Sequence, residues 1–308
     1  MTIHQQRDSH LGAAIDRQFD EDDIQVVFFP TAEFPLAYIS LVDERYAYLD
    51  AQGNILDQWQ GNGRPEEWLF DLHHRLLLDN PGLTIVGFSA MAMLVLVVAG
   101  MLAFWPARAG WRHGLALRGT SRKQLLVTHR NLGIVLAVPF MFTLITGIVL
   151  VFPQETESLL LEDIRRTEAY SDQMVVGIDD ITGPGTGDWL PAMQRALAVF
   201  PGAVLRNTQL PGAYSSQRIF GLQQAGEWNR TGQSRVYIDS LQGWMDLRID
   251  ALNMPLIERV YNSALPLHTG HLNQRWYQAL LSLFGLGVFS IAALGLISFA
   301  RRYFPAGS

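Results

Sequence analysis

The chain has 308 residues, no cysteine and a formal net charge of −6, and 49% of its residues are hydrophobic. Without cysteine, disulfides and thiolate metal sites are excluded, so any metal chemistry has to rest on histidine and carboxylates. We expect no nucleic-acid partner. Charge and hydrophobicity are distributed unevenly, so each segment is considered separately in chain order.

The first segment, residues 1–80, is predicted to fold as a small α+β module. A helix is expected at residues 8–19, followed by strands rich in β-branched and aromatic residues: VVFFP, PLAYISLV, RYAYLD and NILDQW. The turn Asp50-Ala51-Gln52-Gly53-Asn54 indicates a hairpin between the last two strands. An interfacial helix at about residues 65–78 would end the module.

Three long runs contain no charged residue at all: residues 83–105, 131–152 and 279–300. At about 1.5 Å per residue, runs of this length match a hydrocarbon core about 30 Å thick. The sequence therefore predicts a membrane α-helical bundle of three transmembrane helices, with the lipid bilayer as its main partner.

Charge predicts the orientation of these helices. The loop at residues 106–130 carries six cations and no acid, and two arginines lie in the tail at residues 301–308; the eight are Arg108, Arg112, Arg118, Arg122, Lys123, Arg130, Arg301 and Arg302. Under the positive-inside rule these ends are cytoplasmic. All 29 acidic residues lie in residues 1–80 and 153–277, which are therefore predicted to be periplasmic.

An external N-terminal segment would have to cross the membrane, although MTIHQQRDSHLG has no apolar signal core. We therefore expect a further transmembrane helix ahead of residue 1. The second external segment, residues 153–277, repeats the pattern of the first, with a helix in DWLPAMQRALAVF followed by strands in AVLRNTQ, QRIFGLQQ, SRVYIDS and GWMDLRI. Two small α+β modules are predicted from this internal repeat.

WLFDLHHRLLL before the first span, THRNLG at the second and PLHTG before the third resemble the PepSY-associated transmembrane proteins. The resemblance covers the chain from about residue 35 and implies that the external modules are PepSY-like. It matches His73 and His268 to the Asp-Leu-His and Leu-His-Thr-Gly motifs of the family, and His129 to its Leu-His-Arg motif with Thr128 in place of Leu. The family usually carries one more N-terminal helix, where a partner for His129 would lie.

Histidines at helix ends are the candidate ligands. His73 and His268 precede spans on the acidic side and could together supply both axial ligands of a b-type haem. Arg75 could pair with a propionate, and small residues would flank the porphyrin: Gly87, Gly100, Gly133, Gly147, Gly285, Gly287 and Gly295. Glycine in membrane helices equally serves close helix packing.

The other histidines leave alternatives open. His74 and His271 could replace or join His73 and His268, and the four could instead surround Zn²⁺ or Cu²⁺. His129 lies on the basic side, about 30 Å from that group across the bilayer. His4, His10 and His113 are predicted to be solvated surface residues.

The resemblance implies a bacterial inner-membrane protein, since some similar proteins are haem-dependent reductases of ferric siderophores on the periplasmic side. Electrons would come from a quinol or a redox protein. The alternatives are a non-catalytic PepSY membrane anchor that binds an envelope partner, or an accessory subunit in iron or copper transport. No flavin or nicotinamide motif is seen, because the glycines of GPGTGDW lack the strand-turn-helix context.

Overall fold

The computed structural model describes residues 3–32, 34–61, 63–104, 121–166, 189–211, 216–239, 245–272 and 275–303. The chain divides into two compact units. One, called here the sheet unit, comprises Met1–His73 and Glu157–Ser263; the other, the membrane unit, comprises His74–Thr156 and Ala264–Ser308.

The sheet unit is built on one antiparallel sheet of eight strands in the order β4-β3-β2-β1-β5-β6-β7-β8. The strands are β1 (Ile24–Phe28), β2 (Ala37–Leu41), β3 (Arg45–Leu49), β4 (Ile55–Gln60), β5 (Val204–Gln209), β6 (Gln217–Gln223), β7 (Ser234–Asp239) and β8 (Met245–Ile249). A 3₁₀ turn at Glu21–Asp23 leads into β1. Every predicted strand is present, with its ends moved by a few residues.

The two sequence repeats share this sheet, whereas the sequence analysis expected two separate modules. Their first strands, β1 and β5, pair antiparallel with Val27 opposite Thr208. This joins the repeats edge to edge, so that neither first strand is left with an unpaired edge.

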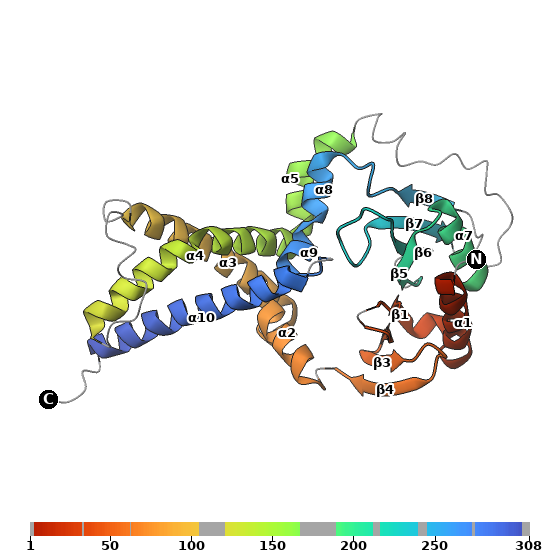
Figure 1. Ribbon diagram of the computed structural model, residues 1–308, viewed down its shortest axis with the longest axis horizontal. Coiled ribbons are helices and arrows are strands. Elements are labelled where there is room, and N and C mark those ends of the chain that lie inside the picture. Colours follow the sequence, from red (N-terminus) through yellow and green to blue (C-terminus); the bar gives the residue numbers. More distant parts are fainter. Residues whose placement is uncertain are drawn as a thin grey trace. The chain divides into compact units, whose positions relative to one another are not determined.

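Two helices cover one face of the sheet, α1 (Ile3–Gln18) and α7 (Trp189–Val199), and they pack against each other (Figure 1). Apolar residues alternate along the strands, as in a half-buried sheet. Ile39, Leu49 and Phe220 are fully buried beneath Leu11 and Met193 of the helices. This core holds the two repeats together.

The membrane unit contains three long helices, α3 (Asp79–Phe104), α4 (Arg122–Val151) and α10 (Arg275–Tyr303). Their mean hydropathies over the most apolar 18-residue windows are 2.5, 2.6 and 2.4, and almost all of the residues in these windows face outwards. A surface of this kind needs lipid around it. α4 packs against both α3 and α10 (Figure 1).

α4 begins earlier than the uncharged run predicts, so residues 122–130 are helical although they were expected in a loop. Ser121 caps this helix: its Oγ accepts a hydrogen bond from the backbone N–H of Gln124, while the Gln124 side chain accepts one from the backbone N–H of Ser121. This capping box starts the helix nine residues before the uncharged run.

The predicted interfacial helix is shorter than expected. α2 (Pro65–Arg75) ends where Leu76 and Leu77 adopt left-handed backbone conformations with φ of 54° and 58°. Gly82 then approaches the end of α2 so closely that a Cβ there would lie 1.6 Å from the carbonyl oxygen of Arg75. The chain therefore turns sharply into α3.

Three further helices were not predicted: α5 (Pro153–Arg165), α8 (Leu256–Asn262) and α9 (Ala264–Thr269). In the sheet unit, Arg165 donates to the buried carboxylate of Glu258 at 3.0 Å, which ties α5 to α8. In the membrane unit, α9 packs against α4 and carries His268.

Candidate functional site

His129 lies on α4, facing α10. Its Nδ1 is 2.9 Å from the carbonyl oxygen of Ile291. A carbonyl oxygen can only accept a hydrogen bond, so Nδ1 carries the proton and Nε2 carries the lone pair. Gly295 lies one turn beyond Ile291, and a Cβ there would come within 3.4 Å of the His129 ring. The missing side chain therefore leaves the space that the imidazole occupies.

His268 repeats this arrangement between α9 and α4. Its Nδ1 lies 3.0 Å from Oγ1 of Thr146, which is also 3.1 Å from the carbonyl oxygen of Phe142. Because the hydroxyl gives its single proton to a carbonyl of the preceding turn, its oxygen accepts from Nδ1–H. The lone pair of His268 is then on Nε2. A Cβ at the neighbouring Gly147 would lie 3.2 Å from Cε1 of the ring.

The two histidines occupy different levels of the membrane unit. His129 and Thr146 are seventeen residues apart on α4, which corresponds to about 26 Å along a helix axis. They cannot bind one metal ion together. The sequence also predicts that the two histidines lie near opposite ends of the bundle; that either of them is a ligand stays a prediction.

The seven glycines proposed to flank a porphyrin divide into three groups. Gly147 and Gly295 face the rings of His268 and His129. Gly87 and Gly287 instead serve helix packing, since a Cβ would lie 2.4 Å from Phe152 and 2.7 Å from Leu136. A Cβ at Gly100, Gly133 or Gly285 would meet nothing within 4 Å. Only the first pair is placed where it affects a candidate ligand.

The other predicted ligands lie near the ends of α2 and α9. His73 and His271 are exposed, and Nδ1 of His271 lies 2.7 Å from Oγ1 of Thr269. His74 and Arg75 are half-buried at the end of α2. Among the described residues, no three His, Asp or Glu side chains gather into a metal-binding group. The pairing of His73 or His74 with His268 stays a prediction.

Arg75 has one feature that suits it to bind a carboxylate. Its Nε is buried, and it has no hydrogen-bond partner among the residues that the structure describes. A buried guanidinium nitrogen left without a partner costs free energy, and a carboxylate would relieve that cost. Among the remaining histidines, His10 is exposed on α1, and His113 lies outside the described residues.

The sheet unit has an aromatic face on the side of the sheet away from α1 and α7. Tyr38, Tyr46, Tyr48 and Trp59 lie side by side on β2, β3 and β4, with ring centroids 4.8 to 6.1 Å apart. Burial in this cluster raises the pKa of Tyr38. We call these four residues the aromatic face.

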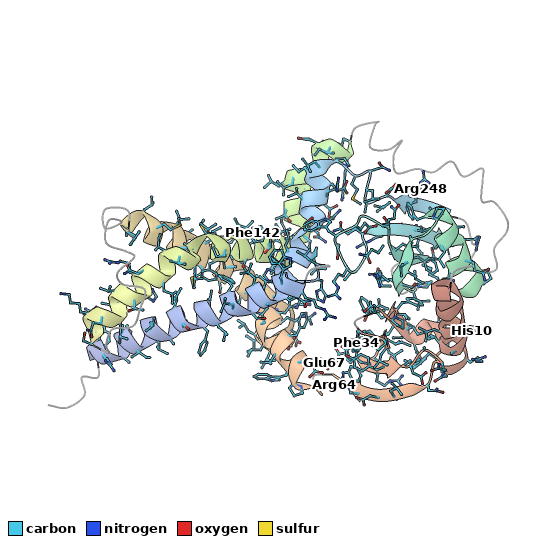
Figure 2. The ribbon with its side chains drawn as sticks, viewed as in Figure 1. His10, Phe34, Arg64, Glu67, Phe142 and Arg248 are labelled. Carbon is cyan, nitrogen blue, oxygen red and sulfur yellow. The ribbon has the colours of Figure 1, made fainter. Side chains whose placement is uncertain are left out.

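Two charged residues close one side of the aromatic face. Cζ of Arg64 lies 3.7 Å from the centroid of the Trp59 ring, a cation–π contact. Oε1 of Glu67 accepts a hydrogen bond of 2.6 Å from the indole N–H of Trp59. Arg64 and Glu67 lie near each other at the start of α2 (Figure 2). The aromatic side chains are therefore fixed in place but remain partly exposed.

Sequence reasoning missed Thr146 and the carbonyl of Ile291. Thr146 lies inside an uncharged run, where threonine usually bonds back to its own helix. The available signal was Thr-Gly at residues 146–147, which places a hydroxyl beside an open helix face.

Together these observations define a membrane protein with three candidate spans, two histidines fixed between helices and an antiparallel sheet unit. The chain matches the family described as PepSY-associated TM region over residues 4–302, so it belongs to that family, as its histidine motifs predict. Comparison with curated proteins gives no match.

Proposed function

We propose that the membrane unit binds b-type haem and that the chain passes electrons across a bacterial inner membrane to ferric iron or a ferric siderophore during iron uptake. The strongest support is that the His129 and His268 rings are held in the same way. Each has Nδ1 in a hydrogen bond and its lone pair on Nε2. Metal-ligating histidines are oriented in the same way, by a hydrogen bond from the other ring nitrogen.

Haem suits the residues present better than a metal ion held by protein side chains alone, because no three His, Asp or Glu side chains gather in the described part of the chain. His268 and His129 would each give Nε2 to an iron atom, with His73 or His74 as the second ligand beside His268. Arg75, whose Nε lacks a partner among the described residues, would pair with a propionate. Haem iron would supply one-electron redox chemistry.

The remaining residues would position and insulate such a site. Thr146 and the Ile291 carbonyl hold the imidazole rings, while Gly147 and Gly295 leave room for them. Outward-facing apolar residues of the three long helices would keep water from both levels. Each electron, given by a quinol or a redox protein, would reduce one Fe³⁺ to Fe²⁺, which hard oxygen ligands bind less tightly.

Charge supports the proposed orientation. All acidic residues lie in residues 1–80 and 153–277, and the arginine-rich loop and tail lie at the other ends of the spans. The sheet unit would then face the periplasm, where its aromatic face would contact the organic ligand of a ferric chelate.

Reduction in membranes tests this function. Membranes from a deletion strain that carries the wild-type chain should reduce a ferric siderophore, trapped as Fe²⁺ by a chromogenic chelator. His268→Ala and His129→Ala should lower the rate to that of the empty strain. His10→Ala, an exposed histidine on α1, is the matched control and should keep the wild-type rate. Equal rates in all strains would contradict the proposal.

The aromatic face favours a second function, in which the helices only anchor a sheet unit that binds an envelope partner. In that case Tyr46→Ala with Trp59→Ala should abolish complementation of a deletion strain, whereas His129→Ala with His268→Ala should have no effect. Tyr237→Ala, on β7 of the second repeat, controls for the loss of a sheet tyrosine. The electron-transfer proposal predicts that the histidine pair is essential.

A further inference from the structure

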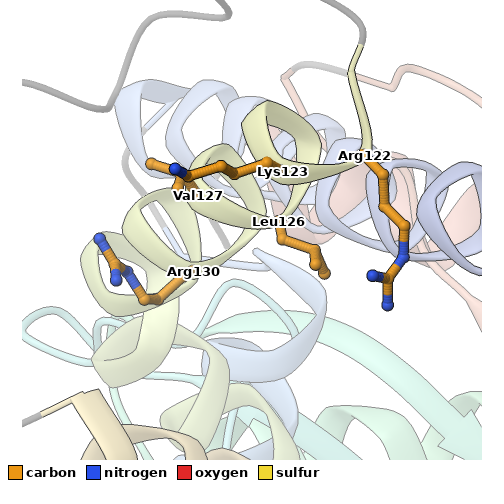
Figure 3. Close-up of a pocket in the computed structure, with 5 residues that line it drawn as sticks. All are labelled: Arg122, Lys123, Leu126, Val127 and Arg130. Carbon is orange, nitrogen blue, oxygen red and sulfur yellow. The ribbon is translucent and has the colours of Figure 1, made fainter.

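The first nine residues of α4 carry a hollow of about 330 Å³, lined by Arg122, Lys123, Leu126, Val127 and Arg130 (Figure 3). We call it the basic hollow. We propose that it binds the headgroup of an anionic phospholipid, with the acyl chains lying along Leu126 and Val127. This site is independent of haem and of electron transfer.

The hollow lies on the outer surface of the bundle. At about 100° per residue, its five residues cover an arc of about 140° on α4. Leu125, Thr128 and Asn131 occupy the opposite arc and are at most 6% exposed, so that side packs against the other helices. The hollow therefore faces whatever surrounds the three spans, which for helices of this hydropathy is lipid.

At the end of the membrane unit where α4 begins, the positive charges are not balanced by acidic residues of the unit. Asp79 and Glu155 are the only acidic residues in the sequence of the unit; Asp79 is the first residue of α3, and Glu155 follows the last residue of α4. Within the described part of the chain, Arg122, Lys123 and Arg130 make no ion pair. Three cations with no carboxylate partner attract an anion.

The order of residues along α4 matches the profile of a phospholipid. Arg122 and Lys123 lie at the helix end, at the level of headgroups, and Leu126 and Val127 follow one turn deeper. Arg130 is deeper still, but helical side chains point back towards the N-terminus, so its long side chain extends towards the headgroup level. Leu126 is 42% exposed, which leaves its side chain available to an acyl chain.

Arg130 is held in place by its neighbours. Its Nε donates a 3.0 Å hydrogen bond to Oδ1 of Asn131, and its Cζ lies 5.7 Å from the ring centroid of Phe104 on α3. Among the residues that the structure describes, its terminal nitrogens make no hydrogen bond, and they would bind a phosphate oxygen. A soluble anion would need only the cations, whereas the apolar half of the hollow favours a lipid.

Thermal unfolding of the full-length protein in a neutral detergent tests the site. Added phosphatidylglycerol should raise the unfolding temperature by several degrees, because a ligand that binds only the folded state stabilises it. Phosphatidylcholine and inorganic phosphate should not. A rise with inorganic phosphate equal to that with phosphatidylglycerol would show an anion site without lipid specificity and would overturn the proposal.

Matched variants locate the site. Arg122→Gln with Lys123→Gln should weaken phosphatidylglycerol binding by about tenfold, since each basic residue near a headgroup contributes several-fold. Arg301→Gln with Arg302→Gln removes the same charge from the end of α10 and should leave most of the binding. Equal losses in both pairs would indicate general surface charge and would contradict a site at the hollow.

A charge-preserving variant separates binding from folding. Arg122→Lys with Arg130→Lys should retain most of the lipid-induced rise, and native mass spectrometry should still detect bound phosphatidylglycerol. If the Gln pair instead binds as much lipid as the wild type, the hollow is not the site.

Discussion

Nδ1 of His268 on α9 lies 3.0 Å from Oγ1 of Thr146 on α4. This contact fixes the tautomer of the ring and its orientation with one hydroxyl group. Ile291 does the same for His129 through a backbone carbonyl, which no side-chain substitution can remove. Thr146 is therefore one position at which the proposed ligand geometry can be changed without substituting a histidine.

Thr146→Val should weaken haem binding while His268 remains. Valine has nearly the shape of threonine but no oxygen to accept from Nδ1–H, and loss of such a supporting contact typically lowers metal affinity by about 10- to 100-fold. Haem titration of the purified apoprotein measures this. The control is Thr143→Val, because the Thr143 hydroxyl bonds to the Pro139 carbonyl of its own helix. An unchanged affinity in Thr146→Val would show that this contact does not support a ligand.

Gly147→Leu should displace the ring of His268. A Cβ at residue 147 already lies 3.2 Å from Cε1, so a larger side chain has no space unless the ring moves. Gly133→Leu is the matched control on the same helix, because a Cβ there meets nothing within 4 Å. Absorption spectra of the two variants, prepared side by side, should differ, with the haem signal reduced only in Gly147→Leu. Equal signals would contradict the assigned role of Gly147.

The sequence predicted the spans well but not the contacts between them. Uncharged runs set by the thickness of the hydrocarbon core are a local signal. α3 covers the first run as far as Phe104, α4 covers the second as far as Val151, and α10 contains the whole of the third. The pairing of β1 with β5 joins segments about 180 residues apart, and no local pattern encodes it. The histidine motifs pointed to His129 and His268, whereas Thr146 depends on the packing of α9 against α4. The early start of α4 could be predicted from Ser121 and Gln124, because these two residues form its capping box.

Gly53→Ala should destabilise the sheet unit more than Gly202→Ala. Both glycines have left-handed backbones, with φ of 85° and 83°, which should cost alanine about 1 kcal/mol. A Cβ at Gly53 would also lie 2.1 Å from Cβ of Ala14 on α1, whereas one at Gly202 meets nothing within 4 Å. Overpacking should add about 1–3 kcal/mol. Denaturant unfolding of both variants measures the difference, and equal losses would show that α1 does not pack on this turn.

Asp50 should make the stability of the sheet unit depend on pH. Its carboxylate accepts hydrogen bonds from the Asn54 side chain and from the backbone N–H groups of Asn54 and Gln52, which lower its pKa. A lowered folded-state pKa contributes stability above the ordinary pKa of an aspartate, and this is lost as pH falls through the folded-state pKa. The stability difference between wild type and Asp50→Asn should therefore shrink as pH falls below about 4. A difference independent of pH would argue against this hydrogen bonding.

The most direct test of the central claim is the absorption spectrum of the full-length protein, purified after expression with added haem precursor. We predict a b-type Soret band that shifts on reduction with dithionite. His268→Ala should lose one part of the signal and His129→Ala another, because the two rings lie at different levels of α4. A colourless wild-type preparation would contradict the account. So would identical spectra of the His268→Ala and His129→Ala variants.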